Sequence, residues 1–329
     1  MPPKSDADLN RREFIGRCAK AGLAAAAAGG IGLGFYDARA PDPSQTGTVG
    51  ARLPDFSVPG PAPRMAVARG NDRSVTVLAA LNALGGMASF IKPGDRVLLK
   101  PNIAFAAPPI LSATTHPDLV KTVAQLCIEA GAAEVIVTDN PINDPASCFA
   151  LTGIDRAARE AGARVMLPGE AFFRPLSVPG ARLVRDWPVL FEPFRRVTKV
   201  IGMAPLKDHH RSGASMCMKN WYGLLGGQRN IFHQDIHTII TELAVMVRPT
   251  LVILDATATM MTNGPTGGSL ADLKQTDTMI VSTDQVAADA FGATLLGLSI
   301  DDLPHIARAE AAGVGTANFE ALNPLHINT

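Results

Sequence analysis

Cysteine is scarce in this chain, and its scarcity excludes a fold held together by disulfides. Only 4 of the 329 residues are cysteine, whereas disulfide scaffolds carry several bridges in a short chain. Cys18 lies near the N-terminus, and Cys127, Cys148 and Cys217 follow it. These last three are compatible with one disulfide and one free thiol, or with three reduced thiols.

Net charge and aromatic side chains are also lacking. Lys and Arg number 30 and Asp and Glu number 30, which argues against a nucleic-acid-binding protein built on a basic surface. Aromatic residues make up 5 %, so the core must consist mainly of Ala, Val, Leu and Ile. Because 47 % of the residues are hydrophobic and 18 % charged, the chain is predicted to be folded rather than disordered.

Long apolar runs are absent apart from a weak one near the N-terminus, residues 19–35, which is mostly Ala and Gly. It follows Arg11, Arg12 and the apolar pair Phe14-Ile15. Two arginines before a weakly hydrophobic segment resemble a twin-arginine export signal; a surface helix with an arginine pair is the alternative. Residues 1–40 are therefore predicted to be an export signal, recognised by the twin-arginine translocation machinery and directing the protein to the bacterial periplasm.

The end of this signal leaves two outcomes open. Ala38-Arg39-Ala40 fits the small-x-small cleavage pattern, but Pro41 would hinder cleavage after Ala40. An uncleaved segment would anchor the protein to the membrane, which is the only membrane contact that we expect. Residues 41–63 are rich in Pro, Gly and Ser and are predicted to be a linker, and residues 64–329 to be one domain.

Apolar strands and amphipathic helices alternate through that domain. The predicted strands are 65–69, 96–100, 134–138, 164–167, 196–203, 250–254 and 278–281. Helices are predicted at 74–87, 119–131, 147–161, 232–247, 284–296 and 303–312. Strands that are apolar throughout and separated by helices predict an α/β fold, with a mostly parallel, doubly wound sheet and helices on both faces. Residues 168–195, rich in Pro and aromatics, are predicted to be an irregular or β-hairpin insertion.

Polar side chains follow five of these strands. In chain order they are Lys100 and Asn102, Asp139, Lys207 and His209, Asp255, and Asp284. Each alone is explained more simply as a turn or helix-cap residue. Together they predict a site, because ligands of open α/β sheets bind beyond the carboxyl ends of the strands. The three aspartates supply oxygen atoms that could bind a divalent metal or orient a histidine.

Other segments carry weaker signals. Residues 205–230 form the most polar stretch and include Lys219 and Asn220. Residues 262–268, TNGPTGG, present Asn263, Thr266 and Gly267 in a turn that either cradles an anion or is a plain flexible loop. The helix-cap pattern around Pro117 does not require His116, which is free to face the cleft. His233 and His237 have metal-binding spacing on a predicted helix, but Gln234 stands where a zinc protease needs Glu.

The order of these motifs resembles the family called domain of unknown function 362. The segments that carry the resemblance are KPN (100–102), TTHP (114–117), EVIVTD (134–139), residues 205–227, residues 254–268 and residues 282–297. The central signature of the family is Lys-x-His followed by Lys-Asn-aromatic-Gly, which matches Lys207 and His209 and then Lys219, Asn220, Tyr222 and Gly223. The resemblance covers about residues 64–315. Many relatives append a ferredoxin segment with repeated Cys-x-x-Cys spacing, which this chain lacks, so no four-Cys iron–sulfur cluster within the mature chain is expected.

Two hypotheses for function remain open. In the first, the protein binds a small anionic ligand or cofactor through Lys100, Lys219 and their neighbours, with Lys207, His209 and His116 as candidates for acid–base catalysis. In the second, it is a non-catalytic accessory or maturation partner of an exported redox or iron–sulfur system. A closed cleft in which the lysines and histidines converge would favour the first. An exposed apolar patch around Phe172, Phe173 and Trp187 would favour the second.

Overall fold

The computed structural model describes residues 52–58 and 64–329. The predicted export signal and its cleavage site lie outside the described residues, as does most of the predicted linker. Within the described part of the chain, no helix is long and apolar enough to cross a membrane.

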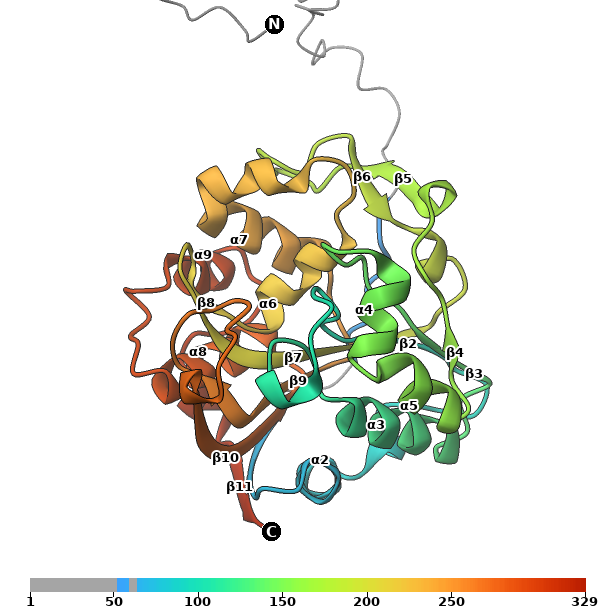
Figure 1. Ribbon diagram of the computed structural model, residues 1–329, viewed down its shortest axis with the longest axis vertical. Coiled ribbons are helices and arrows are strands. Elements are labelled where there is room, and N and C mark those ends of the chain that lie inside the picture. Colours follow the sequence, from blue (N-terminus) through green and yellow to red (C-terminus); the bar gives the residue numbers. More distant parts are fainter. Residues whose placement is uncertain (1–51, 59–63) are drawn as a thin grey trace, which may run out of the picture. The chain divides into compact units, whose positions relative to one another are not determined.

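One nine-stranded sheet organises the described domain, in the order β11-β1-β10-β9-β7-β2-β3-β4, with β8 paired to β7 (Figure 1). The strands are β1 (Met65–Arg69), β2 (Arg96–Lys100), β3 (Glu134–Val137), β4 (Arg164–Val165), β7 (Lys199–His209), β8 (Gly213–Ser215), β9 (Leu251–Met260), β10 (Leu273–Ser282) and β11 (Leu325–Asn328). The pairs β4–β3, β3–β2, β2–β7, β7–β9 and β1–β11 are parallel. The predicted α/β fold with a mostly parallel sheet is thus confirmed.

Helices cover both faces of the sheet, as predicted, which explains why its central strands are apolar throughout. On one face lie α2 (Arg73–Ala83), α3 (Pro117–Glu129), α4 (Pro145–Leu151) and α5 (Ile154–Glu160); on the other lie α6 (Cys217–Asn220), α7 (Ile236–Met246), α8 (Gln285–Leu295) and α9 (Pro304–Ala311) (Figure 1). Successive residues of each strand feed opposite cores: Leu98 packs on the α6–α9 face and Leu99 on the α2–α5 face.

Among the long strands, β10 breaks the parallel arrangement, and its direction corrects the prediction for Asp284. β10 runs antiparallel to both β9 and β1, because β9 and β10 form a long hairpin rather than being joined by a helical crossover. Its carboxyl end therefore lies at the edge opposite to those of β2 and β7. There Asp284 accepts hydrogen bonds from the backbone N–H groups of Val286 and Ala287 and caps α8.

The Pro- and aromatic-rich insertion contains a hairpin of its own, β5 (Phe173–Leu176) and β6 (Trp187–Leu190), paired antiparallel. The side chains of Phe172, Phe173 and Trp187 pack against the core on the α6–α9 side. The sequence prediction of a β-hairpin in this region is confirmed.

Residues 52–58 lie against the domain, although the sequence places them in the linker. Phe56 is buried, and its backbone N–H donates to the carbonyl of Arg248 over 3.0 Å. The hydroxyl of Thr250 donates in turn to the carbonyl of Phe56 over 2.7 Å. This short stretch therefore packs as part of the domain surface.

The three thiols whose oxidation state the sequence left open, those of Cys127, Cys148 and Cys217, are free and buried.

The predicted helix 232–247 is shorter than expected. A 3-10 segment, η8 (Arg229–Asp235), precedes α7 (Ile236–Met246). His233 and His237 consequently do not share one helix face.

Candidate functional site

A cavity of about 540 Å³ opens beyond the carboxyl ends of β2, β3 and β7. Seven of the residues that line it were predicted from the sequence to share a site: Lys100, Asn102, Asp139, Lys207, His209, Lys219 and Asn220. They come from β2 and the segments that follow β2 and β3, from β7, and from the short helix α6. Lys207 and His209 lie on β7 itself, because this strand continues past Pro205 and pairs with β8.

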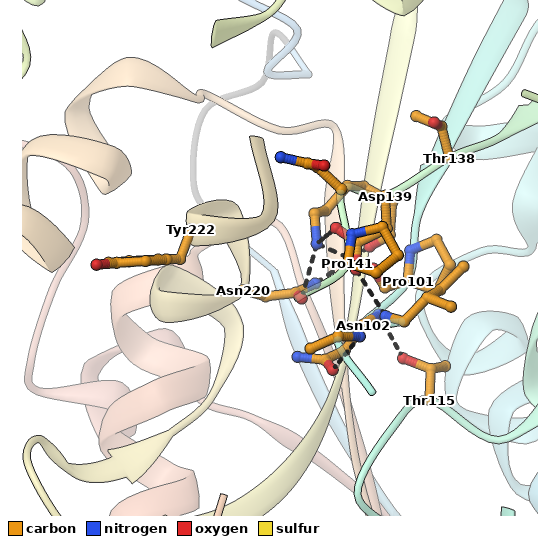
Figure 2. Close-up of polar contacts among 12 residues, drawn as sticks. Pro101, Asn102, Thr115, Thr138, Asp139, Pro141, Asn220 and Tyr222 are labelled. Atoms are coloured by element: carbon orange, nitrogen blue, oxygen red, sulfur yellow. Dashed lines mark hydrogen bonds and ion pairs between the residues drawn. The ribbon is translucent and has the colours of Figure 1, made fainter. Parts of the chain in front are cut away.

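The floor of the cavity is a buried network around Lys100. Its ammonium lies 2.6 Å from Asp139 Oδ1, and it donates to the side-chain oxygen of Asn220 and the carbonyl of Pro101, each over 3.0 Å. Asn220 reaches from α6 towards the ends of β2 and β3 (Figure 2). Burial lowers the pKa of Lys100, and the charge of Asp139 opposes that shift. One ion pair and two hydrogen bonds thus hold this ammonium, which makes Lys100 part of the support of the cavity.

Asn102 is fixed next to this network. Its backbone N–H donates to the hydroxyl of Thr115 over 2.8 Å, and that hydroxyl donates to the carbonyl of Met203 on β7 over 2.9 Å (Figure 2). The threonine thus ties the segment after β2 to the neighbouring strand and holds Asn102 at the cavity wall.

Two lysines bring positive charge into the cavity without a carboxylate partner in the described residues. Lys207 is buried, donates to the carbonyl of Ala113, and lies 5.2 Å from the ring centre of Phe105. Burial, together with the charge of Lys219, lowers the pKa of Lys207 to about 7. Burial and the charge of Arg229 lower the pKa of Lys219 to about 7.

Arg229 at the edge of the cavity has a structural role. Its two terminal nitrogens donate to four carbonyl oxygens, those of Tyr222, Leu225, Asn140 and Pro141, over 2.8–3.2 Å. Arg229 thereby ties the loop after β3 to the segment after α6. Because carbonyl groups do not cancel its charge, it also contributes positive potential to the cavity.

Three imidazole rings stack along one wall. His209 lies 5.0 Å from His210 and 6.0 Å from His233, with interplanar angles of 9° and 12°. Nδ1 of His209 accepts a hydrogen bond from the backbone N–H of Arg211 over 3.2 Å, so Nε2 carries the hydrogen of the neutral ring. Burial and the charge of Lys219 lower the pKa of His209 to about 2. This ring is thus neutral at ordinary pH and offers an N–H donor.

Comparison with known proteins places these residues in a family. The model of the family described as "Domain of unknown function (DUF362)" matches residues 97–294, more than half of the chain. The chain belongs to the DUF362 family. It is also 29 % identical over 262 residues to a thylakoid-associated protein of Synechocystis sp., an alignment that covers 74 % of this chain and 76 % of that protein. The part that matches DUF362 runs from β2 to α8 and contains all the cavity residues described above.

The structure does not bring every predicted residue of the DUF362 domain to the cavity. His116 caps α3, where its Nδ1 accepts from the backbone N–H of Asp118, and it lines a different hollow together with Arg73. It therefore does not join Lys207 and His209 at the cavity. Burial and the charge of Arg73 lower the pKa of His116.

The loop 262–268 reaches the cavity only through Pro265. Asn263 donates its side-chain N–H to Asp272 Oδ1 over 2.6 Å, and its carbonyl accepts from the backbone N–H of Gly267. The predicted site residues of this loop, Asn263, Thr266 and Gly267, do not line the cavity. The polar groups of Asn263 hold the hairpin loop together, and the structure does not bring the polar side chains of this turn into the cavity.

The three aspartates proposed as metal ligands are separated. Asp139 pairs with Lys100, Asp255 pairs with Arg73 over 2.7 Å, and Asp284 caps α8 at the opposite edge. In residues 52–58 and 64–329, no group of three or more His, Cys, Asp or Glu side chains is arranged to hold a metal ion. The fold therefore does not bring these three aspartates together to bind one metal ion.

Sequence reasoning missed Arg229, His210 and the cavity role of His233. All three lie in or next to polar stretches that the sequence does single out, residues 205–230 and the pair His233 and His237. Their convergence depends on the 3-10 segment η8 turning back over the strand ends. Hydrophobic periodicity does not encode that turn.

A second hollow of about 740 Å³ adjoins the cavity and shares Asn140, Tyr222, Arg229 and His233 with it. Its remaining wall includes Phe173 and Pro188 from the β5–β6 hairpin. Gly226 lets that hairpin approach, since a Cβ there would lie 2.6 Å from the ring of Phe173. The charged cavity therefore continues to the β5–β6 hairpin, where Phe173 and Pro188 provide apolar surface.

Proposed function

We propose that this DUF362 protein binds a small anionic ligand, a carboxylate or a phosphate, in the cavity at the ends of β2, β3 and β7. The observation that carries the proposal is the unbalanced charge of Lys207 and Lys219. Among the described residues that line the cavity, Asp139 is the only carboxylate, and Lys100 already neutralises it. An anion would supply the missing negative charge.

The energetics support the same conclusion. Holding two ammonium groups in a desolvated cavity is unfavourable, and this cost lowers the pKa of Lys207 and of Lys219 to about 7. A bound anion would favour the charged forms and reverse both shifts. Strongly shifted groups gathered in a cleft are typical of functional sites rather than of ordinary surfaces.

The imidazole wall has a binding role in this proposal. The sequence suggested His209 and His116 as acid–base groups because the pKa of histidine usually lies near working pH. Here the pKa of His209 is lowered to about 2 and His116 lines another hollow. We therefore assign His209 the role of a neutral N–H donor to the anion. The two lysines, whose pKa values lie near 7, become the candidates for proton transfer.

The adjoining hollow bears on ligand size. Phe173 and Pro188 offer apolar surface next to the charged groups, so the ligand is expected to carry a ring or short chain beyond its anionic group. The β5–β6 hairpin would then select among ligands that share the same charged end.

Export is the second part of the proposal. The twin-arginine pattern of residues 1–40 favours a protein outside the cytoplasm, and the thylakoid association of the Synechocystis sp. relative is in keeping with a protein that is exported or associated with a membrane. We propose the bacterial periplasm, with a membrane tether if residues 1–40 are retained. N-terminal sequencing of protein from separated periplasmic and membrane fractions tests this: a mature start near residue 41 indicates cleavage, and protein only in the cytoplasm contradicts export.

The alternative role as a partner of a redox system has less support. It calls for an exposed apolar surface, and the aromatics of the insertion are packed instead. The rings of Trp187 and Phe232 lie 4.5 Å apart, and Trp187 Nε1 donates to the carbonyl of Gly226. Co-purification of a stoichiometric iron–sulfur protein from the native host would revive this alternative.

Titration calorimetry with sodium sulfate at pH 6.5 and low ionic strength tests the anion site. Sulfate keeps its charge over the pH range of these experiments, so any change of its affinity with pH comes from titration of the protein. We expect binding by the wild type, loss of about tenfold or more in affinity for Lys207→Met, and no change for Lys274→Met. Lys274 is exposed on β10 and does not line the cavity, so this variant removes the same charge elsewhere. An equal loss of sulfate affinity in both variants would mean that sulfate is attracted by the general surface charge and is not bound in the cavity.

A further inference from the structure

The three lysines of the cavity differ in how completely their ammonium groups are bound. Lys100 has an ion pair and two hydrogen bonds. Lys207 donates to one carbonyl and rests against Phe105. Lys219 Nζ has no hydrogen-bond acceptor and no carboxylate partner among the described residues, and it lies 5.4 Å from the centre of the Tyr222 ring.

Lys219 is also held where a ligand can reach it. It lies on the last turn of α6, and its side chain is half-buried and lines the cavity. The adjacent Asn220 is fixed by hydrogen bonds to the carbonyls of Lys100 and Met203. The backbone of α6 is thus anchored to the sheet, while the amine of Lys219 remains unengaged beside the fixed positive charge of Arg229.

We propose that the side-chain amine of Lys219 is a nucleophile that forms an imine with an anionic carbonyl compound, a molecule carrying an aldehyde or ketone next to a carboxylate or phosphate. This inference rests on the proposed function of the cavity and adds a covalent step to it. Lys207 and Arg229 supply the charge that holds the anionic group, and Lys219 meets the carbonyl carbon.

The protonation state of Lys219 suits this step. A lysine amine attacks only in its free-base form, and desolvation next to another cation is an established way to produce that form. Because the pKa of Lys219 is lowered to about 7, about half of its side chains are free amines at pH 7. For an exposed lysine that fraction is on the order of one in a thousand.

The step balances without a further reactant. The amine lone pair forms a C–N bond, and the carbonyl π pair moves to oxygen. Two protons pass in turn from nitrogen to that oxygen, the C–O bond breaks with loss of water, and a C=N bond remains. His233, whose Nδ1 contacts the hydroxyl of Tyr222, lines the same cavity and can hold each proton in transit.

Trapping with pyridoxal 5′-phosphate and borohydride tests the proposal on the intact protein. The probe joins an aldehyde to a phosphate, and borohydride reduces the imine to a stable amine that peptide mass spectrometry locates. At pH 7 and a probe concentration below that of the protein, we expect Lys219 to be labelled about tenfold or more above Lys92, Lys121 and Lys274, in line with its larger free-base fraction. Pyridoxal, which lacks the phosphate, should label Lys219 far less.

Two controls separate this inference from the anion site itself. Lys219→Arg keeps the positive charge but cannot form an imine, so it should still bind sulfate while the trapped adduct disappears. Sulfate binding without preferential labelling of Lys219 in the wild type would overturn the nucleophile and leave the anion site standing. Labelling mainly of Lys207 would also overturn the assignment of Lys219 as the nucleophile. Both of these outcomes are measured on the wild type, so they do not require a variant to fold.

Discussion

Gly223 packs directly against Asp139, so closely that a Cβ on the glycine would lie 2.0 Å from Asp139 Oδ1 and 2.7 Å from Lys100 Nζ. Its carbonyl accepts a hydrogen bond from the backbone N–H of Asn140 over 3.0 Å, which fixes the two segments together. The Lys100–Asp139 pair therefore exists only because position 223 has no side chain.

Gly223→Ala is accordingly expected to destabilise the protein by about 2 kcal/mol or more, since a methyl group inserted there separates a buried ion pair. Urea unfolding followed by circular dichroism measures the change. Gly169→Ala is the matched control, because residue 169 has an ordinary extended backbone (φ −131°) and open space around its Cβ position. Equal stability of the two variants would show that the network at the cavity floor is unimportant.

Removing the amine of Lys219 should stabilise the ligand-free protein while weakening anion binding. The pKa of Lys219 is about 7 in the fold, below its ordinary value of 10.5, so the unfolded state binds more protons between these values. Wild-type stability should therefore rise as pH increases from 7 to 10. Lys219→Met should show a smaller rise, since Lys207, whose pKa is also lowered to about 7, keeps its own contribution, and it should melt about 2 °C or more higher at pH 7, as differential scanning calorimetry at both pH values would show. A lower melting temperature for the variant at pH 7 would contradict the charge imbalance.

Sulfate affinity should fall as pH rises through 7. Lys207 and Lys219 are ammonium groups below that pH and lose their protons above it. Between pH 6 and pH 8.5 the affinity should drop by about thirtyfold for each lysine that must be charged. The other ionisable groups at the cavity are Lys100, Asp139, His209, His210, Arg211, Tyr222, Arg229 and His233. Calorimetry at four pH values measures the slope, and a flat profile would exclude the two lysines as the anion contacts.

A buried histidine pair away from the cavity predicts acid instability. His305 on α9 is 1 % exposed, and its Nδ1 lies 3.0 Å from Nδ1 of His237 on α7. Burial and the neighbouring His237 lower the pKa of His305 to about 3, so the unfolded state takes up a proton first as pH falls below 6.5. Stability is then lost between pH 6.5 and 3, and by pH 5 the loss is on the order of 2 kcal/mol.

His305→Gln should reduce the loss between pH 7 and pH 5 by about 2 kcal/mol, whereas His209, whose pKa is also lowered, keeps its own contribution; unfolding free energies at the two pH values would show this. The exposed His326 provides the control as His326→Gln. An unchanged difference between the two pH values in His305→Gln would mean that other groups cause the acid sensitivity.

Much of the fold could be predicted because apolar runs mark buried strands. The bounds predicted for 65–69 and 96–100 match β1 and β2. The direction of β10 could not be predicted, since a strand that is apolar on both faces reads the same in either orientation. The predicted end of the strand at residue 203 was also too early. β7 continues through Pro205 to His209 because β8 and β9 provide pairing partners that the local sequence does not reveal.

The candidate site was predictable to the extent that parallel strands share an edge. That rule places Lys100, Asp139 and Lys207 together, and the structure has them at one end of the sheet. It does not specify which hollow a side chain enters, and so it grouped His116 with side chains that line a different one. Nor does it report which polar groups satisfy one another: Asn263 and Asp272 pair within a loop in a way that only the folded hairpin shows.

The most direct test of the central claim is the position of an anion in a crystal. Selenate resembles sulfate and scatters anomalously, so a soak at pH 6.5 with data collected at the selenium edge locates it without ambiguity. We predict a strong peak inside the 540 Å³ cavity within hydrogen-bond distance of Lys207 or Lys219 Nζ. Peaks confined to helix ends and surface arginines, with only water in the cavity, would contradict the account.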